Sequence, residues 1–411
     1  MSASSASPLA LTRRGALAAG LGAALFGSNA FAAAVNNRKL VVIIARGGMD
    51  GVSLIPPIGD SNYVPLRGEI AIPADAALRL DSTFGLHPKL ENLYRMTKAG
   101  EARIAPAVAI PERIRSHFEA QDLLESGGAK LYGATTGWLN RALATTDGAS
   151  LKALAVGAQT PLILRGPIQA QSWSPGGKAP ASADRLVTAL QDLYAGDHLL
   201  GPAFASGLQT EAMAEQLTSA PAMPAPANAM ADGAKPAAPQ AADPQAFAVT
   251  TAKFLTAPGG PQMAVLSLDG FDTHARQGAA EGQLATRFRI LDQVLAGLQT
   301  GLGPAWKDTI VVVATEFGRT ARINGTLGLD HGTASAVVIA GGALKPGGIV
   351  GDWPTMANDK LFENRDLAPT LDVRSVFKAA LIDHMGLDRR QVETTVFPDS
   401  ANAPPVANLI A

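Results

Sequence analysis

The chain has 411 residues, a formal net charge of −1 and no cysteine. The lack of cysteine excludes disulfides, thiolate metal sites and a cysteine nucleophile, so any chemistry falls to histidine, carboxylate and hydroxyl side chains. The near-neutral charge and the absence of a basic block argue against nucleic acid as a partner.

The N-terminal residues have the pattern of an export signal. Arg13 and Arg14 form a pair, and residues 15–34 are uncharged and rich in Ala and Gly. The Ala-Phe-Ala at 30–32 is the small-x-small pattern that signal peptidase accepts. We predict a twin-arginine signal peptide over residues 1–32, passage through the twin-arginine translocase, and a periplasmic or secreted protein. The alternative is a Sec signal that contains two arginines by chance. No run is apolar and long enough for a stable membrane anchor.

The mature chain, residues 33–411, is predicted to form a single α/β domain. Continuous apolar runs typical of buried parallel strands span 39–45, 103–110, 263–268, 309–314 and 334–340. Helices are predicted near 88–99, 116–127, 138–143, 282–298 and 370–386, the last with Thr370 as its N-cap. This alternation predicts a mostly parallel central sheet with helices on both faces.

Residues 220–245 differ in composition from the rest of the chain. Six prolines lie among alanines there, with hardly any large apolar side chains. Such a segment cannot bury enough apolar surface to offset the entropy of ordering it. We therefore predict a disordered insert that loops out of the domain.

Polar side chains lie at the ends of the predicted strands, where open parallel sheets bind ligands. Along the chain they are Asp50, Ser116, Asp272, His274, Glu316, Asp330 and His331. Carboxylates and imidazoles without cysteine suit zinc, manganese or magnesium. Asp272 and His274 are two residues apart, so in an extended segment they point the same way and can share one cation. Each pair also has an ordinary structural explanation, a turn for Asp272 and His274 and a salt bridge for Glu316 and Arg319.

Longer motifs resemble one bacterial family when they are taken in order. They are RGGMDG at 46–51, RSHFEAQD at 115–122, GWLNR at 137–141, GFDTH at 270–274, EFGRT at 316–320, DHG at 330–332, GDWP at 351–354 and DVR at 372–374. The set is similar to that of the family called domain of unknown function 1501, whose members are often exported by the twin-arginine route. That family is grouped by fold with alkaline phosphatases and sulfatases, so the resemblance implies an alkaline-phosphatase-like fold.

The resemblance also implies roles for individual residues. Ser116 corresponds to a nucleophile at the start of a helix, Asp272 and His274 to ligands of one metal, and His331 to the last metal-binding histidine. His117, next to the nucleophile, is a ligand, a base or a structural residue. The metal set would be completed by Asp50, Glu316 and Asp330.

Two departures from the superfamily pattern affect the expected number of metal ions. Phe317 follows Glu316 where a histidine is usual, and Asp50 lies beyond the aligned positions, Gly47 and Gly48. The resemblance therefore implies one divalent ion, or two in an altered site. Two arrangements are then open: Arg319 supplies positive charge where a second ion would sit, or Asp330 takes a place beside His331 in the altered site.

We accordingly expect an exported metal-dependent hydrolase that acts on a small phosphate or sulfate ester. The alternative is a non-catalytic binding or assembly protein that keeps the fold, which Phe317 and the displaced Asp50 favour. Three histidines outside this set have structural interpretations. His87 is expected to start a helix, although the family's Leu-His-Pro pattern leaves a pocket role open for it. His384 is expected to be a cation near a helix C-terminus, and His198 to lie on the surface.

Overall fold

The computed structural model describes residues 37–146, 151–157, 159–174, 183–194, 196–198, 200–218 and 243–411. The predicted signal peptide lies outside these residues, and so does the predicted insert up to residue 242. Helix α9 (Pro244–Thr256) begins inside the predicted insert, with the Asp243 carboxylate accepting a hydrogen bond from the Gln245 amide. The insert was therefore predicted a few residues too long at its C-terminal end.

A central sheet of eight strands runs in the order β10-β4-β9-β8-β1-β7-β5-β6. The strands are β1 (Lys39–Ala45), β4 (Ala102–Ala109), β5 (Ala153–Val156), β6 (Gln171–Trp173), β7 (Met263–Leu268), β8 (Thr309–Ala314), β9 (Ser335–Ala340) and β10 (Leu371–Asp372). Every neighbouring pair is parallel except those of β9, which runs antiparallel to β4 and β8. The predicted mostly parallel sheet is confirmed.

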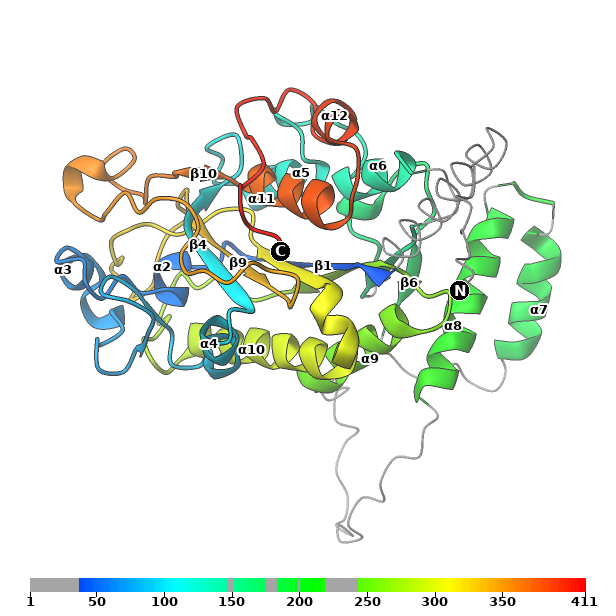
Figure 1. Ribbon diagram of the computed structural model, residues 1–411, viewed down its shortest axis with the longest axis horizontal. Helices are drawn as coiled ribbons and strands as arrows, with labels where there is room; N and C mark the ends of the chain where they lie inside the picture. The colour runs from blue at the N-terminus through cyan, green and yellow to red at the C-terminus, as the bar shows by residue number, and fades with distance from the viewer. Residues whose placement is uncertain are drawn as a thin grey trace, which may run out of the picture.

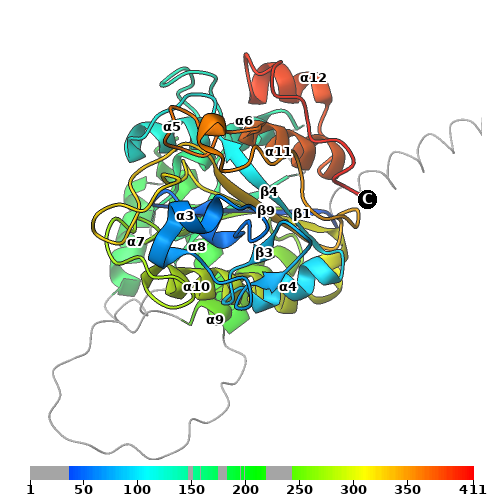
Figure 2. The ribbon, with the colours of Figure 1, turned by 90° about the vertical axis from the view of Figure 1, so that its left-hand side faces the viewer.

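Helices cover both faces of this sheet, as predicted. Figures 1 and 2 show α5 (His117–Ser126), α6 (Trp138–Ala144), α11 (Val373–Ala379) and α12 (Arg389–Gln391) above it, with α4 (Glu91–Lys98), α9 and α10 (Gln283–Leu302) below. Alternate residues of β1 face the two layers, so Val42 packs in one apolar core and Val41 in the other. Burial of both faces explains why the strands are apolar throughout.

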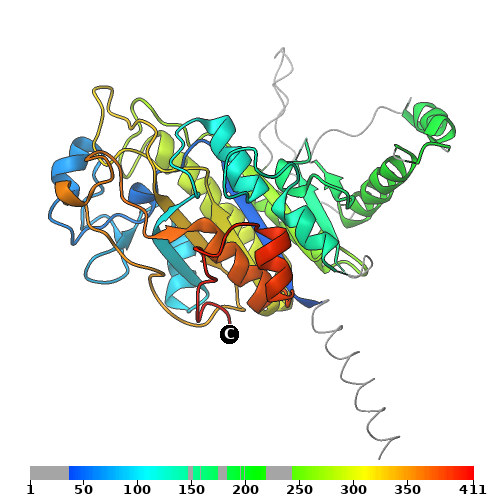
Figure 3. The same ribbon diagram turned by 90° about the horizontal axis from the view of Figure 1, so that it is seen from above.

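The remaining elements extend the two ends of the domain. Figures 1 and 3 place α2 (Gly51–Leu54) and α3 (Tyr63–Arg67) at one end, and α7 (Ala183–Tyr194) and α8 (Leu200–Thr218) at the other. A short hairpin joins β2 (Leu78–Arg79) to β3 (Gly85–Leu86). Among the described helices, none has the length and apolarity needed to cross a membrane.

Two predicted helix starts are wrong. Helix α11 is capped by Asp372, whose carboxylate accepts the Arg374 amide at 2.9 Å, whereas the Thr370 amide binds the β4 carbonyl of Ala107. Helix α4 begins at Glu91, after a separate turn in which the His87 imidazole accepts the amide of Lys89. Local capping patterns alone do not reveal that tertiary contacts occupy the earlier residues.

The reversed direction of β9 brings one more segment to the edge of the sheet that matters for function. The N-terminal end of β9 lies beside the C-terminal ends of β4 and β8, because β9 pairs antiparallel with both of these strands. Residues just before β9 therefore meet residues that follow β1, β4, β7 and β8. Asp330 and His331 reach this edge although they precede their strand.

Candidate metal centre

Three side chains from separate parts of the chain could hold a metal ion at this edge. They are His117, which begins α5 after β4, Asp272, which follows β7, and His331, which precedes β9. One ligand atom from each lies within 4.8 Å of the others. Two imidazoles and a carboxylate are a common protein donor set for a catalytic zinc ion. The Asp272 side chain is 43% exposed, so the group is open to solvent.

The two histidines of this triple are held so that their Nε2 atoms face Asp272, at 3.4 Å for His117 and 3.3 Å for His331. The Nδ1 of His331 donates to the carbonyl of Arg115 at 2.7 Å, and the Nδ1 of His117 donates to Oε1 of Glu316 at 2.8 Å. In a neutral imidazole whose Nδ1 carries the proton, Nε2 is left with a lone pair. This arrangement is typical of metal-binding histidines.

The Nε2 atom of His117 shows that a metal fits the donor set. It is buried and has no hydrogen-bond partner among the described residues, and it lies 3.4 Å from Oδ2 of Asp272. Buried polar nitrogens in folded proteins are almost always satisfied. A cation shared with Asp272 and His331 would satisfy this one.

His274 adjoins the triple, close to where the sequence places it. Its Nε2 lies 3.0 Å from Oδ1 of Asp272 and 2.9 Å from Nε2 of His331. Two imidazole nitrogens at this separation need a proton or a cation between them. Its Nδ1 lies 3.5 Å from Oδ1 of Asp330, which also accepts a hydrogen bond from the Asn324 amide. Asp330 thus stands behind His274 and outside the triple.

Glu316 stands behind His117 in the same way. Its buried carboxylate accepts hydrogen bonds from the Gly47 amide at 2.9 Å and from Gln121 at 3.1 Å, besides that of His117. Burial by itself raises the pKa of Glu316, but these hydrogen bonds, chiefly that of His117, bring it below its ordinary value. The pKa of His117 is raised, mainly by the same hydrogen bond. Glu316 therefore orients a histidine and does not join the triple.

Arg319, predicted to be catalytic, is fully buried and bonded to protein groups. Its Nη2 donates to Oδ1 of Asp272 at 2.5 Å, and its other donors reach the carbonyls of Gly47, Gly48 and Leu329. Burial opposes ionisation of Asp272, but the hydrogen bond and charge of Arg319 hold the pKa of that carboxyl below its usual range. Arg319 is thus a fixed positive charge beside the triple that holds Asp272 in place.

Asp50 does not join the cluster, which corrects its assignment as a metal ligand. Both of its oxygens pair with the buried guanidinium of Arg67, at 2.6 and 3.0 Å, and Gln277 donates a further hydrogen bond at 3.0 Å. Gly47 and Gly48 have φ values of +109° and +63°, and the turn they form separates Asp50 from the end of β1. No local sequence pattern marks Arg67 as the partner of Asp50.

Ser116 is the N-cap residue of α5, but its hydroxyl makes no capping hydrogen bond. It is half-buried and lies between Arg115, whose carbonyl holds His331, and His117. The predicted helix start is therefore correct, while the simple capping role is not. The hydroxyl of Ser116, next in sequence to His117, has no hydrogen-bond partner among the described residues.

Sequence reasoning missed the residues that support Glu316. Gln121 also accepts a hydrogen bond from Arg46 at 2.7 Å, and Arg46 pairs with the buried carboxylate of Glu125 at 2.5 Å. Arg46 and Gln121 both lie inside the motifs quoted above, and membership of those motifs was the one feature of the sequence that pointed to them. Phe317 is not a ligand, since its buried ring packs 4.8 Å from the rings of both His117 and His331.

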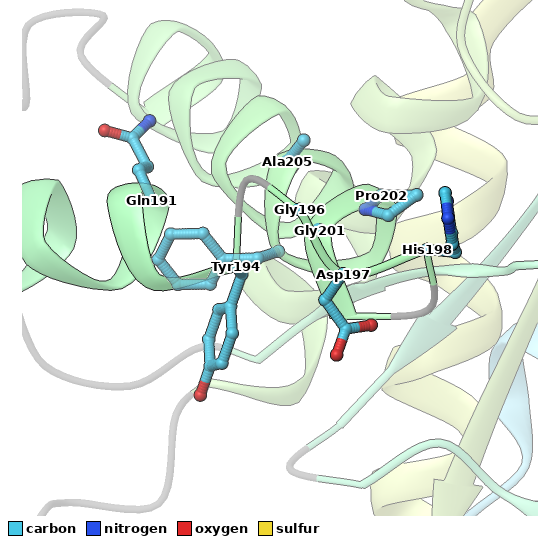
Figure 4. Close-up of a pocket in the computed structure, with 9 residues that line it drawn as sticks. Gln191, Tyr194, Gly196, Asp197, His198, Gly201, Pro202 and Ala205 are labelled. Atoms are coloured by element: carbon cyan, nitrogen blue, oxygen red, sulfur yellow. The ribbon is translucent and has the colours of Figure 1, made fainter.

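A separate hollow of about 520 Å³ lies between the end of α7 and the start of α8 (Figure 4). Tyr194, Phe204 and the exposed His198 are among its lining residues, and the predicted surface position of His198 is confirmed. None of the lining residues belongs to the metal centre. The hollow therefore contributes nothing to the site described above.

Comparisons with known proteins give one family and several distant likenesses of fold. The family model described as "Protein of unknown function (DUF1501)" matches residues 37–396. No curated protein matches the chain.

Among solved structures, Ps i-CgsB in complex with k-i-k-neocarrahexaose is similar at 9% identity and a TM-score of 0.41, over 90% of this chain and 77% of that one. The phosphonate monoester hydrolase of Agrobacterium radiobacter is similar at 10% identity and a TM-score of 0.37, over 85% of this chain and 74% of that one. The zinc complex of the C-terminal periplasmic domain of EcEptC from Escherichia coli is similar at 11% identity and a TM-score of 0.35, over 74% of this chain and 72% of that one. Likenesses at these scores carry no conclusion about function.

Proposed function

This chain belongs to the DUF1501 family, whose description assigns no reaction, and we propose from its site that it is an exported metal-dependent hydrolase of a phosphate or sulfate ester. The observation that carries this proposal is the buried, unpartnered Nε2 of His117, set beside Asp272 and His331. A donor set of this kind with an open, half-exposed carboxylate is suited to a catalytic ion rather than to a closed structural one.

The ion would be held by His117, Asp272 and His331, with His274 alongside. Zinc fits two imidazoles and a carboxylate well, and manganese is compatible with the same donors. When bound, a divalent ion lowers the pKa of a nearby hydroxyl and stabilises charge on a phosphoryl or sulfuryl oxygen. Arg319 keeps Asp272 ionised and provides the second positive charge, so we propose a single ion.

Ser116 is the proposed nucleophile. Its Oγ would form a bond to phosphorus or sulfur while the bond to the ester oxygen breaks, and the leaving alcohol takes up a proton. Water then cleaves the new Oγ bond and regenerates the serine, so that each turnover consumes one ester and one water. Support comes from its position between two residues that contact the centre and from the lack of any capping bond.

Export by the twin-arginine route is part of the proposal and rests on Arg13, Arg14 and the Ala-Phe-Ala at 30–32. Replacing both arginines by Lys should leave precursor in the cytoplasm, and mature protein should begin near Ala33. Unchanged export of the Lys-Lys variant would indicate the Sec route.

The hydrolase proposal is tested with the mature protein, stripped of metal by a chelator and reloaded with Zn²⁺ or Mn²⁺. Chromogenic phosphate monoesters, phosphate diesters and sulfate esters are the probes. We expect release of the alcohol from one ester class that requires metal and is lost in Ser116→Ala. Metal binding without release from any of these esters would instead favour the non-catalytic binding protein.

A further inference from the structure

The loop that carries His274 is fixed by hydrogen bonds to a second loop. The amides of Arg276 and Gln277 donate to the carbonyls of Thr326 and Leu327, both at 2.9 Å. The hydroxyl of Thr326 donates to the carbonyl of His274 at 2.8 Å. The loop that carries His274 is therefore tied to the segment that leads to Asp330 and His331.

Two residues of these loops adopt a backbone conformation that disfavours their side chains. Arg276 has a φ of +47° and Leu327 a φ of +60°. This left-handed region is natural for glycine and uncommon for other residues. Both residues are exposed, so burial of their side chains does not explain why they stand there. Strained residues of this kind are concentrated at binding and catalytic sites.

Arg276 also differs from the other arginines around the centre. Arg46, Arg115 and Arg319 are each held by a carboxylate, those of Glu125, Asp366 and Asp272 respectively. The guanidinium of Arg276 has no hydrogen bond or ion pair with any described residue. A cation two residues from His274 in the chain is therefore available to a ligand.

The position of Arg276 allows it to reach a ligand at the metal centre. It is two residues from His274, a backbone separation of at most about 7 Å, and an arginine side chain is of similar length. A guanidinium presents a planar fork of N–H donors that matches the oxygens of a phosphate or sulfate group. Arg276 combines this charge with donors that no described residue uses.

We propose that Arg276 binds the anionic phosphate or sulfate group of the substrate beside the metal centre, an inference that rests on the proposed function. Leu327 provides a matched position, with the same kind of strain in the paired loop and no charge.

The test compares Arg276→Gly with Leu327→Gly in the metal-loaded mature protein. Both changes remove left-handed strain, so both variants should keep or raise the melting temperature. Binding of inorganic phosphate and of sulfate is measured by calorimetry, with Zn²⁺ affinity measured separately. We expect Arg276→Gly to weaken anion binding by roughly tenfold to a hundredfold, since the loss of hydrogen bonds to a charged group typically lowers affinity by that factor. Leu327→Gly should bind the anion as the wild type does, and Arg276→Lys should recover part of the loss.

Three results would overturn the inference. Unchanged anion affinity in Arg276→Gly would show that the guanidinium does not touch the ligand. An equal loss in both glycine variants would assign the effect to loop conformation. Failure of the metal-loaded wild type to bind either anion would contradict the proposed function itself. A normal Zn²⁺ affinity in Arg276→Gly shows that its loss of anion binding does not come from damage to the metal centre.

Discussion

Arg319 and Asp272 form an ion pair in which the guanidinium is fully buried and the carboxylate is open to solvent. The two carboxylate oxygens of Asp272 face different groups. Oδ1 faces Arg319 at 2.5 Å, whereas Oδ2 lies nearest the unpartnered Nε2 of His117. A permanent positive charge on one side of Asp272 disfavours a second cation there, which is the physical reason for proposing one ion.

Glu316 should control metal affinity through His117. Glu316→Gln replaces one of the two acceptor oxygens with an amide that cannot accept the hydrogen bonds directed at it. We expect Zn²⁺ affinity to fall by about 10–100-fold, as is typical when the group behind a ligand histidine is changed. Calorimetric titration of the purified variants measures this.

The matched control is Glu125→Gln. Glu125 is equally buried and hydrogen-bonded, to Arg46 and to the Ile163 amide, but does not contact a histidine of the centre. Both variants should melt at a lower temperature than the wild type. An equal loss of Zn²⁺ affinity in the two would show that the effect is general destabilisation.

Ser116→Ala separates a nucleophile from a helix cap. Because the hydroxyl makes no capping hydrogen bond, the free energy of unfolding should change by no more than about 0.5 kcal/mol. Turnover of the ester should be lost. Asp388→Ala removes a true cap, whose carboxylate accepts the Gln391 amide at 2.9 Å, and should cost about 1 kcal/mol. If Ser116→Ala is destabilised as much as Asp388→Ala and remains active, Ser116 is a helix cap and not a nucleophile.

Asp50 should prove structural. Asp50→Asn leaves the Arg67 guanidinium buried without its charge partner, a change that typically costs about 3–5 kcal/mol. Urea unfolding should report this loss, and Zn²⁺ affinity should stay within a factor of about two of the wild type. A selective loss of metal binding with normal stability would return Asp50 to the ligand set.

His384 should make the fold sensitive to acid. The residue was expected to be a cation, but it is buried, its Nε2 donates to the Lys39 carbonyl at 2.9 Å, and burial lowers its pKa to about 4. The unfolded chain binds this proton near its ordinary pKa of ~6.5, so the unfolded state carries more protons between these values. The free energy of unfolding should therefore fall as the pH drops from about 6.5 to about 4, by roughly 3 kcal/mol in all.

His384→Gln keeps a side-chain donor for the Lys39 carbonyl and removes the titration. Its melting temperature should decline less steeply with falling pH than that of the wild type. His198→Gln, at an exposed position, should follow the wild-type curve. Parallel curves for wild type and His384→Gln would contradict the low pKa of His384.

The strands that carry the site were predictable to within about one residue, because burial on both faces makes β1, β7, β8 and β9 apolar throughout. The short strands β5, β6 and β10 of the central sheet were missed, since runs of two to four residues carry little periodic signal. The meeting of Asp272, His274 and His331 was predictable, because all three lie next to predicted strands. The antiparallel direction of β9 was not, because it depends on pairing with strands distant in the sequence. The Asp50–Arg67 pair could not be foreseen because nothing local marks Arg67 as its partner.

The metal centre is tested most directly by calorimetric titration of the metal-free mature protein with Zn²⁺, alongside His117→Ala and Asp272→Asn. We predict one ion per chain in the wild type and a large loss of affinity in both variants, with their folds intact by circular dichroism. Two ions per chain would contradict the role of Arg319 as the second positive charge. Absence of binding, or binding unaffected by either change, would contradict the metal centre itself.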